Sequence, residues 1–372
     1  MKRLLIGGSV MGVVLLVSFY AVYQQAFAPT DSQVPTHTLT EPDEIRIVAD
    51  NLEVPWEVRI LPAGDVLVTE RTGSLVRIAE DGSVQRVTVP AIVSGGEGGL
   101  LGLVLHPNFV ENRWIYLYRT AASENGRINQ VVRYQYQEDH TLTDETIILD
   151  AIPGARYHDG GRLEFGPDGY LYVTTGDAGV PELAQATSSL AGKILRITDT
   201  GAIPADNPYQ NHVYSYGHRN PQGIAWDEEG RLWSTEHGRS GLQSGMDELN
   251  LIYAGGNYGW PVIEGDEENN HMLAPLVHSG PDETWAPASL AIAGSDVYFA
   301  GLRGESLYQA TLQGNGEIGE LTAFLRREYG RLRTVRVHED VVYLLTSNTD
   351  GRGRADANDD VLLSVPRGLL TP

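Results

Sequence analysis

Residues 156–177 have the sequence RYHDGGRLEFGPDGYLYVTTGD, in which a loop, a tight turn and a short strand follow one another. The turn sequence Gly-Pro-Asp-Gly at 166–169, followed by alternating residues at 170–175, predicts a β-hairpin. His158 lies on the loop beside this strand. A histidine there is a candidate general base, because its charge changes near neutral pH. The alternative is a structural histidine that makes only local hydrogen bonds.

Six stretches of the chain share a pattern: a turn with Asp or Asn and Gly, an alternating strand, a polar break and a second strand. They are residues 62–78, 106–134, 156–197, 227–250, 294–310 and 338–365. Such units recur at roughly 45–65 residues, the spacing of β-propeller blades with long insertions. A small twisted sheet cannot bury both faces alone, so we expect the units to pack radially. The sequence therefore predicts an all-β fold, a six-bladed β-propeller over residues 43–366, with a tail at 367–372.

The chain of 372 residues is strongly acidic, with 49 Asp and Glu against 27 Lys and Arg and a formal net charge of −22. This balance argues against a nucleic acid partner, because binding to a phosphate backbone needs a basic surface. It is typical of a soluble secreted protein and is compatible with a bound cation. The chain has no cysteine, which excludes disulfides and thiolate metal sites.

The first 42 residues are expected to lie outside the propeller. Lys2 and Arg3 precede an apolar run from residue 4 to about 23, and Ala-Phe-Ala at 26–28 resembles a cleavage site. Residues 1–28 are therefore predicted to be a secretory signal peptide. An uncleaved N-terminal membrane anchor is the alternative, because the run is nearly long enough to span a bilayer. Residues 29–42 are a predicted linker, and either alternative places the propeller outside the cytoplasm, in the periplasm or secreted.

Long segments separate the predicted strands at residues 94–100, 178–189, 203–222, 236–246 and 255–287. Long loops in a compact fold are usually functional. In a propeller such loops gather at one end of the central channel, which is where we expect a site.

Several arginines are candidates for holding an anion. Arg219 and Asn220 lie in a turn, GHRNPQG at 217–223, and offer fixed hydrogen-bond donors and an acceptor. Arg331 and Arg333 are two residues apart on a predicted strand and so project to the same side. Their guanidinium groups repel unless an anion or carboxylates lie between them, and Arg303 is a further cation of this kind. Structural salt bridges are the alternative for each of them.

A possible cation site lies in residues 235–239, TEHGR, and 247–250, DELN. Backbone carbonyls on a glycine-containing loop, together with side-chain oxygens, are the ligands that Ca²⁺ accepts. The alternative is a turn with a solvated acidic face. Residues 350–360 superficially resemble a calcium loop but lack Asp or Asn at the third and fifth positions, so we expect a blade loop there.

These segments, taken in order, resemble the soluble aldose sugar dehydrogenases that depend on pyrroloquinoline quinone (PQQ), the glucose/sorbosone dehydrogenase family. The resemblance covers nearly all of the propeller. It runs through residues 54–56 (VPW), 98–103 (GGLLGL), 106–109 (HPNF), 156–177, 192–196 (GKILR), 217–223, 257–261 (NYGWP) and 331–333 (RLR). The family's six-bladed propeller agrees with the count of repeats.

The resemblance implies oxidation of an aldose at C1 to the lactone, with hydride transfer to PQQ. His158 matches the catalytic base, and Asp177 matches the carboxylate that orients it. Arg219 and Asn220 match residues at the quinone and the substrate. The electron acceptor and the preferred aldose are not implied.

The resemblance also implies a cofactor site and a metal site. Arg303, Arg331 and Arg333 match cations that hold the PQQ carboxylates, although a lysine is familiar at the first of these places. Gly238 and Arg239 match positions whose backbone carbonyls bind the Ca²⁺ that touches PQQ.

Two further residues match the substrate region of the family. Glu97 stands where the glucose-oxidising members carry Gln, a departure that leaves the substrate range open. Trp285 matches an aromatic residue at the mouth of the pocket. Two other functions compete with this interpretation: a calcium-dependent hydrolase of the lactonase type, and a binding propeller without catalysis.

Overall fold

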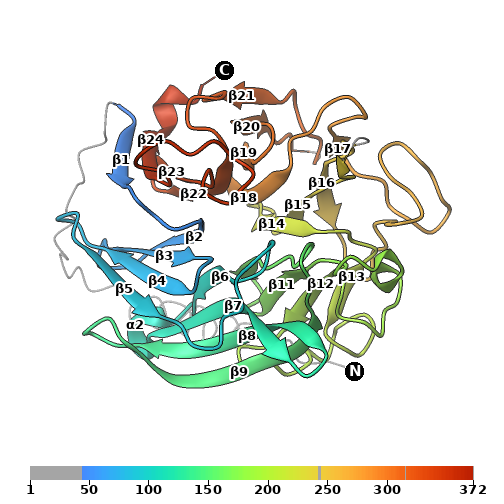
Figure 1. The fold of residues 1–372 in the computed structure, drawn as a ribbon. Helices are drawn as coiled ribbons and strands as arrows, with labels where there is room; N and C mark the ends of the chain where they lie inside the picture. The colour runs from blue at the N-terminus through green and yellow to red at the C-terminus, as the bar shows by residue number, and fades with distance from the viewer. Residues whose placement is uncertain (1–43, 242–243, 315, 372) are drawn as a thin grey trace, which may run out of the picture. The chain divides into compact units, whose positions relative to one another are not determined.

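The computed structural model describes residues 44–241, 244–314 and 316–371. These residues form six four-stranded antiparallel sheets arranged in a ring, which confirms the predicted six-bladed β-propeller (Figure 1). The innermost strands of neighbouring blades contact one another around the centre.

The blades follow the chain in order. Blade 1 contains β2 (Pro55–Ile60), β3 (Val66–Glu70), β4 (Ser74–Ile78) and β5 (Val84–Thr88). Blade 2 contains β6 (Leu100–Leu105), β7 (Trp114–Ser123), β8 (Gly126–Tyr136) and β9 (Leu142–Pro153). Blade 3 contains β10 (Leu163–Phe165), β11 (Leu171–Thr175), β12 (Lys193–Ile197) and β13 (Val213–Tyr216).

The other three blades are built in the same way. Blade 4 contains β14 (Pro221–Trp226), β15 (Leu232–Glu236), β16 (Glu248–Ile252) and β17 (Val277–His278). Blade 5 contains β18 (Pro287–Ala293), β19 (Asp296–Gly301), β20 (Ser306–Thr311) and β21 (Thr322–Phe324). Blade 6 contains β22 (Leu332–His338), β23 (Val341–Thr346), β24 (Leu362–Pro366) and β1 (Arg46–Ala49). The short helices are α2 (Phe109–Asn112), η1 (Pro181–Ala184) and η3 (Arg367–Leu369).

The ring is closed by the two ends of the described chain. Strand β1 pairs antiparallel with β24, with Arg46 opposite Ser364 and Ala49 opposite Leu362. Blade 6 therefore takes one strand from the start of the propeller and three from its end. This pairing holds the first and last blades together without an exposed gap in the sheet.

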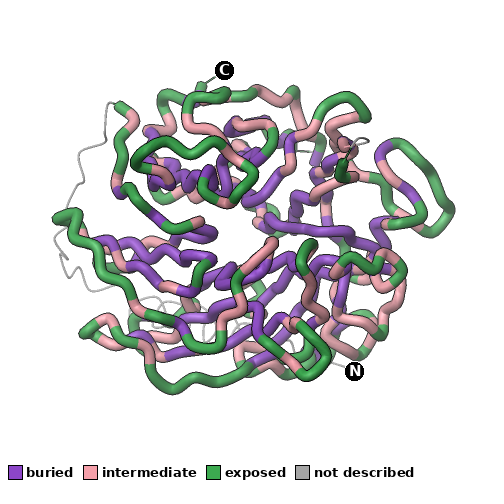
Figure 2. The backbone as a smooth tube through the Cα atoms, viewed as in Figure 1, coloured by how far each residue is buried: buried purple, intermediate pink, exposed green. Residues whose placement is uncertain are grey.

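The hydrophobic cores lie between blades, because each cluster of buried side chains takes residues from neighbouring blades. Figure 2 shows that buried residues follow the strands. Strand β11 is buried along its whole length because both of its faces meet neighbouring blades. Leu171 and Val173 of β11, for example, share a core with Tyr116 and Tyr118 of blade 2. The predicted turn before β11 forms, and Gly169 adopts a φ of +78°, a conformation that favours glycine.

Two of the segments expected to be loops also contain strands. Strand β13 lies within residues 203–222, and β17 lies within 255–287; each is the outermost strand of its blade. These strands are too short and too irregular in sequence to be recognised from alternation. The predicted tail packs on the propeller, since Arg367 donates to Asp296 of blade 5 at 2.9 Å and Leu370 is buried.

The predicted signal peptide or anchor at 1–28 and the whole of the predicted linker at 29–42 lie outside the described residues. In the part of the chain that the structure describes, no helix is long and apolar enough to cross a membrane.

A group of charged side chains from three inner strands and the adjoining Arg162 forms what we call the channel cluster. Its members are Glu57, Arg59, Arg162, Glu164 and Arg336. Glu57 is fully buried and pairs with all three arginines. Glu164 pairs with Arg59 and Arg336, both at 2.8 Å. The cluster ties blades 1, 3 and 6 together.

Candidate active site

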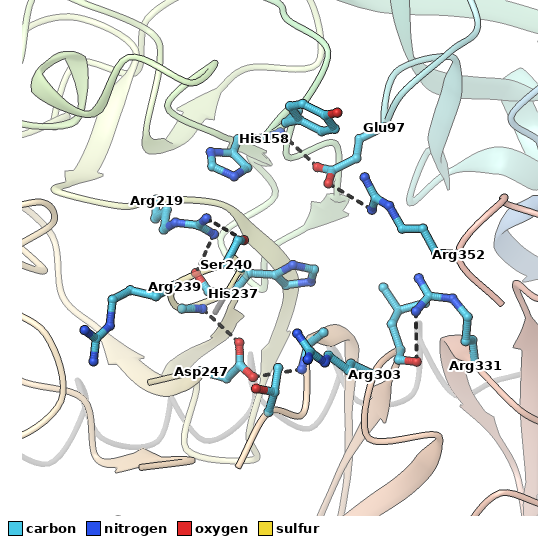
Figure 3. Close-up of a pocket in the computed structure, with 16 residues that line it drawn as sticks. Glu97, His158, Arg219, His237, Arg239, Ser240, Asp247, Arg303, Arg331 and Arg352 are labelled. Atoms are coloured by element: carbon cyan, nitrogen blue, oxygen red, sulfur yellow. Dashed lines mark hydrogen bonds and ion pairs between the residues drawn. The ribbon is translucent and has the colours of Figure 1, made fainter. Parts of the chain in front are cut away.

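The loops at one end of the propeller surround a cavity of about 470 Å³ (Figure 3). Four of the five long segments expected to gather at one end contribute lining residues, namely 94–100, 203–222, 236–246 and 255–287, whereas 178–189 contributes none. The lining residues are Glu97, Tyr157, His158, Arg219, His237, Gly238, Arg239, Ser240, Gly241, Asp247, Thr284, Ala286, Leu302, Arg303, Arg331 and Arg352.

His158 and Asp177 form a hydrogen-bonded couple at this cavity. The Nδ1 atom of His158 lies 2.7 Å from Oδ1 of Asp177. Asp177 also accepts from the backbone amide of Gly179 at 2.7 Å and from Nε1 of Trp260 at 2.9 Å. Burial alone would raise the pKa of Asp177, but the contacts with His158, Gly179 and Trp260 lower it. Asp177 is therefore a carboxylate that fixes the imidazole and leaves Nε2 to meet a ligand.

The backbone at His158 is held in an unusual conformation. Its φ is +62°, in the left-handed region that is unfavourable for a residue with a side chain. Gly176 makes this possible, because a Cβ at that position would lie 1.9 Å from the carbonyl oxygen of His158. The loop before β10 therefore rests directly on the end of β11.

Glu97 contacts the same loop. Its Oε2 accepts from the backbone amide of His158 at 2.8 Å and from Nδ2 of Asn220 at 3.4 Å. Its Oε1 accepts from Nη1 of Arg352 at 3.1 Å. Burial would raise the pKa of Glu97, but His237, the His158 amide and Arg352 outweigh burial and lower it to about 2. Glu97 is therefore ionised at neutral pH.

Asn220 does not line the cavity. Its side chain is buried and is engaged by Glu97 and by the backbone amide of Gly160, which donates to Oδ1 at 3.0 Å. Arg219 lines the cavity and donates to the carbonyl of His237 at 3.3 Å and to Oγ of Ser240 at 2.9 Å. Burial lowers the pKa of Arg219.

Arg331 and Arg333, which the sequence left open between an anion clamp and salt bridges, differ in the structure. Arg331 pairs with Asp350 at 2.9 Å. Arg333 is buried and donates to Oε1 of Gln222 at 2.6 Å, and burial lowers its pKa to about 9. Its Nε has no hydrogen-bond partner among residues 44–241, 244–314 and 316–371. Arg303 is exposed and lines the cavity.

Gly238 and Arg239 lie on the loop between β15 and β16 and line the cavity. The amide of Gly238 donates to Oδ1 of Asp247 at 2.9 Å, and Oδ2 of Asp247 accepts from Trp285 and Ala286 amides at 2.7 and 2.8 Å. Backbone amides thus donate hydrogen bonds to both oxygens of the Asp247 carboxylate. Within the described ranges, no three His, Asp or Glu side chains are grouped as metal ligands.

The structure corrects the expected position of Trp285. This side chain is 5% exposed and does not line the cavity. It packs against Phe299 and Tyr308 in the core beneath, at ring centroid distances of 5.4 and 5.8 Å. Its backbone amide donates to Asp247 at 2.7 Å, while its side chain belongs to the core and the next residue, Ala286, lines the cavity.

The lining residues that the sequence analysis did not select include Tyr157, His237 and Arg352. Burial lowers the pKa of His237 to about 3, so the ring is neutral, and its Nε2 has no partner in the described part of the chain. Tyr157 and His237 are direct neighbours of the selected residues His158 and Gly238. That adjacency was the available signal, whereas no motif predicts that the loop of Arg352 lies at this cavity.

The sequence matches the glucose/sorbosone dehydrogenase family over residues 52–362. The chain belongs to this family. It is 34% identical over 304 residues to quinoprotein glucose dehydrogenase B of Acinetobacter calcoaceticus, covering 72% of this chain and 62% of that protein. It is 35% identical over 232 residues to aldose sugar dehydrogenase YliI of Escherichia coli, covering 59% of this chain and 62% of that protein.

A solved structure shows the same fold. The PQQ-bound form of an aldose sugar dehydrogenase from Streptomyces coelicolor superimposes with a TM-score of 0.81 at 40% identity, covering 87% of this chain and 98% of that one. The resemblance found in the sequence is confirmed, and the chain is an oxidoreductase of a sugar dehydrogenase family.

Proposed function

We propose that this protein oxidises aldose sugars at C1 to the lactone, using PQQ and Ca²⁺. The observation that carries the proposal is the His158–Asp177 couple, joined at 2.7 Å, in a cavity lined by arginines. Two of its relatives are a quinoprotein glucose dehydrogenase and a PQQ-bound aldose sugar dehydrogenase, and both support the same cofactor and substrate class.

The residues at the cavity fit PQQ. The cofactor has three carboxylates, and Arg303, Arg331 and Arg333 supply guanidinium groups at or beside the cavity. The Nε atom of Arg333 and the Nε2 atom of His237 are each buried without a hydrogen-bond partner among the described residues. Buried polar atoms without partners cost free energy, so a polyanion that accepts a hydrogen bond from the Arg333 guanidinium would be favoured.

The proposed Ca²⁺ site uses the backbone carbonyls of Gly238 and Arg239. Ca²⁺ takes oxygen ligands, and carbonyls on a loop at the cavity are suitable. Asp247 would contribute by holding the amide of Gly238 at 2.9 Å, which sets the orientation of this loop. The remaining ligands would come from the cofactor and water.

When bound, PQQ supplies the quinone that accepts a hydride from C1 of the sugar. Nε2 of His158 would take the proton of the C1 hydroxyl group. Asp177 would stabilise the imidazolium that forms and keep Nδ1 in its protonated form. Arg219 would orient the reacting groups from the wall of the cavity, and Asn220 would act indirectly through Glu97.

The two competing functions are less well supported. A hydrolase of the lactonase type needs carboxylates that converge on the metal, but backbone amides engage both oxygens of Asp247. A binding propeller without catalysis gives no reason for a buried carboxylate to hold a histidine at the cavity. The His158–Asp177 couple therefore favours the dehydrogenase.

The experiment is a calorimetric titration of PQQ into the metal-free and the Ca²⁺-loaded protein, followed by dye reduction with a panel of aldoses. We expect tight binding that requires Ca²⁺, turnover with aldoses and release of the lactone. Absence of PQQ binding in both states would overturn the proposal. The panel also identifies the preferred aldose, and comparison of acceptors tests the electron-transfer partner.

The location of the protein is a separate part of the proposal. We infer a periplasmic or secreted protein from the basic and apolar residues at 1–28. Fractionation of cells, with mass determination of the mature N-terminus, distinguishes a cleaved signal peptide from a membrane anchor.

A further inference from the structure

An ion pair joins blade 6 to the loop before blade 2 at the cavity. Arg352 lies on the loop between β23 and β24, and Glu97 lies on the loop between β5 and β6. The Nη1 atom of Arg352 is 3.1 Å from Oε1 of Glu97, a contact between residues 255 positions apart (Figure 3). Both side chains line the cavity that contains His158.

The second oxygen of Glu97 holds the backbone of the proposed base. Oε2 accepts from the His158 amide at 2.8 Å. This amide belongs to a residue with a φ of +62°, a conformation that persists only where neighbouring contacts stabilise it. Glu97 supplies such a contact, so the position of the His158 side chain depends on where the Glu97 carboxylate lies.

We propose that Arg352 and Glu97 are positioning residues: Arg352 fixes the carboxylate of Glu97, which fixes the backbone of His158 and thereby aims its ring at the substrate. We call the three residues the positioning chain. The inference rests on the proposed function, because the role of His158 as the base is part of that function.

The contacts of Glu97 favour this role over one confined to the substrate. Both of its oxygens are occupied by protein donors, from Arg352 on one side and from His158 and Asn220 on the other. A glutamine would keep one oxygen for the His158 amide but would lose the attraction for Arg352. The charge of Glu97 is therefore needed for the contact with blade 6.

The test compares Arg352→Gln with Arg354→Gln. Arg354 is exposed, lies two residues further along the same loop and does not line this cavity. Arg352 is 42% exposed in its side chain, so the ion pair has a modest effect. We expect Arg352→Gln to lower kcat about fivefold with PQQ affinity unchanged within about twofold, Arg352→Lys to recover most of the loss, and Arg354→Gln to have no effect.

A double-variant cycle tests whether Arg352 acts through Glu97. We expect Glu97→Gln to lower kcat to a similar extent, and Glu97→Gln with Arg352→Gln to be no slower than the slower single variant. Glu97→Ala, which also removes the acceptor of the His158 amide, is expected to be slower than either. Losses that multiply in the double variant would overturn the proposal.

A readout without cofactor separates this inference from the proposed function. In ¹⁵N-labelled apoprotein, the His158 amide resonance, assigned by its loss in His158→Gln, should shift in Arg352→Gln and Glu97→Gln but not in Arg354→Gln. An unchanged resonance with unchanged kcat in Arg352→Gln would refute the positioning chain. Failure of the wild-type protein to bind PQQ would refute the proposed function, and the amide resonance would still decide on the chain.

Discussion

Two groups of arginines in the propeller differ in what neutralises them. In the channel cluster, Arg59, Arg162 and Arg336 each have a Glu57 or Glu164 oxygen within 4.0 Å. Around the cavity, a second group has no such Asp or Glu oxygen in the described residues. We call Arg219, Arg303 and Arg333 the cavity cluster.

The difference separates arginines that are neutralised within the fold from arginines that are available to an anionic ligand. A buried cation without a counterion costs free energy, and burial accordingly lowers the pKa of Arg219 and Arg333. In the channel cluster, Glu57 and Glu164 offset part of this cost, although burial still lowers the pKa of Arg162 to about 10. Arg219 and Arg333 have no such carboxylate in the described part of the chain, which is expected where an anionic ligand provides the missing charge.

The largest effect is expected in the channel cluster. Glu57→Gln removes the carboxylate shared by three arginines and should lower the free energy of unfolding by about 3–5 kcal/mol. Urea unfolding of the apoprotein measures the loss. Glu228→Gln, at an exposed turn of blade 4, is the control. An equally small loss in both variants would mean that the channel cluster does not stabilise the fold.

At the cavity, the largest effect should be on catalysis and not on stability. His158→Gln keeps a polar side chain but cannot accept the proton at neutral pH, so kcat should fall at least about a hundredfold. PQQ occupancy and melting temperature should be nearly unchanged. Asp177→Asn should slow turnover less, because Asp177 orients the ring without taking the proton.

His271→Gln, an exposed histidine away from the cavity, is the control for this substitution. Turnover of His158→Gln within a few-fold of wild type would contradict the assignment of the base. A lower melting temperature with normal turnover per folded molecule would support the alternative of a structural histidine.

Replacement of one arginine in each cluster tests the comparison directly. Arg333→Met removes a cation proposed to face the PQQ carboxylates, so we expect PQQ affinity to fall at least about tenfold, or about 1.4 kcal/mol. Because the charge that it removes is buried and has no carboxylate partner among the described residues, we expect no loss of apoprotein stability. Arg162→Met, in the channel cluster, should lower stability and leave PQQ affinity unchanged. Calorimetry and urea unfolding on both variants measure these effects. An equal loss of stability in Arg333→Met and Arg162→Met would contradict the proposed difference between the two clusters.

Lys193 extends the comparison to a buried cation that has neither a carboxylate nor a place at the cavity. Its Nζ donates to the carbonyls of Leu183, Ala184 and Ala191 at 2.8, 2.9 and 2.5 Å. Burial lowers the pKa of Lys193 from 10.5 to about 7, so between these pH values the unfolded chain binds more protons. The contribution of Lys193 to stability should therefore rise with pH between about 7 and 10.5 and be constant below about pH 7, where both states are protonated.

A folded-state pKa of about 7, against 10.5 in the unfolded chain, corresponds to a rise in stability of about 2 kcal/mol between pH 7 and 9. Lys193→Met should flatten this rise while lowering stability at every pH, because three carbonyls lose their donor. Melting temperatures across the range measure both effects. A steeper rise in the variant would contradict the assigned direction.

The architecture could be predicted from the sequence because each blade repeats a local pattern. The hairpin before β11, for instance, follows from Gly169 and the alternation after it. The pairing of β1 with β24 could not be predicted, because a four-residue strand carries little signal and its partner lies more than 300 residues away. The short outer strands β13 and β17 were missed for the same reason.

Site residues that lie within a sequence motif could be predicted. Site residues on loops that only folding brings together were harder to predict. The loops of His158, Arg219 and Gly238 reached the cavity as expected from their motifs. The place of Arg352 at the cavity could be found only from the structure, because its partner Glu97 is remote in the chain. Trp285 was expected at the mouth of the pocket, but its ring packs against Phe299 and Tyr308 in the core.

The seam between β1 and β24 determines how the propeller responds to a force applied at the two ends of the chain. Arg46, at the start of β1, lies opposite Ser364, near the end of β24. A force that pulls the two chain ends apart would therefore open the seam one hydrogen bond after another, as a zipper opens, instead of loading all of its bonds in shear. We expect optical tweezers to detach β1 at low force and then unravel blade 6, whereas heating would melt the closed ring cooperatively.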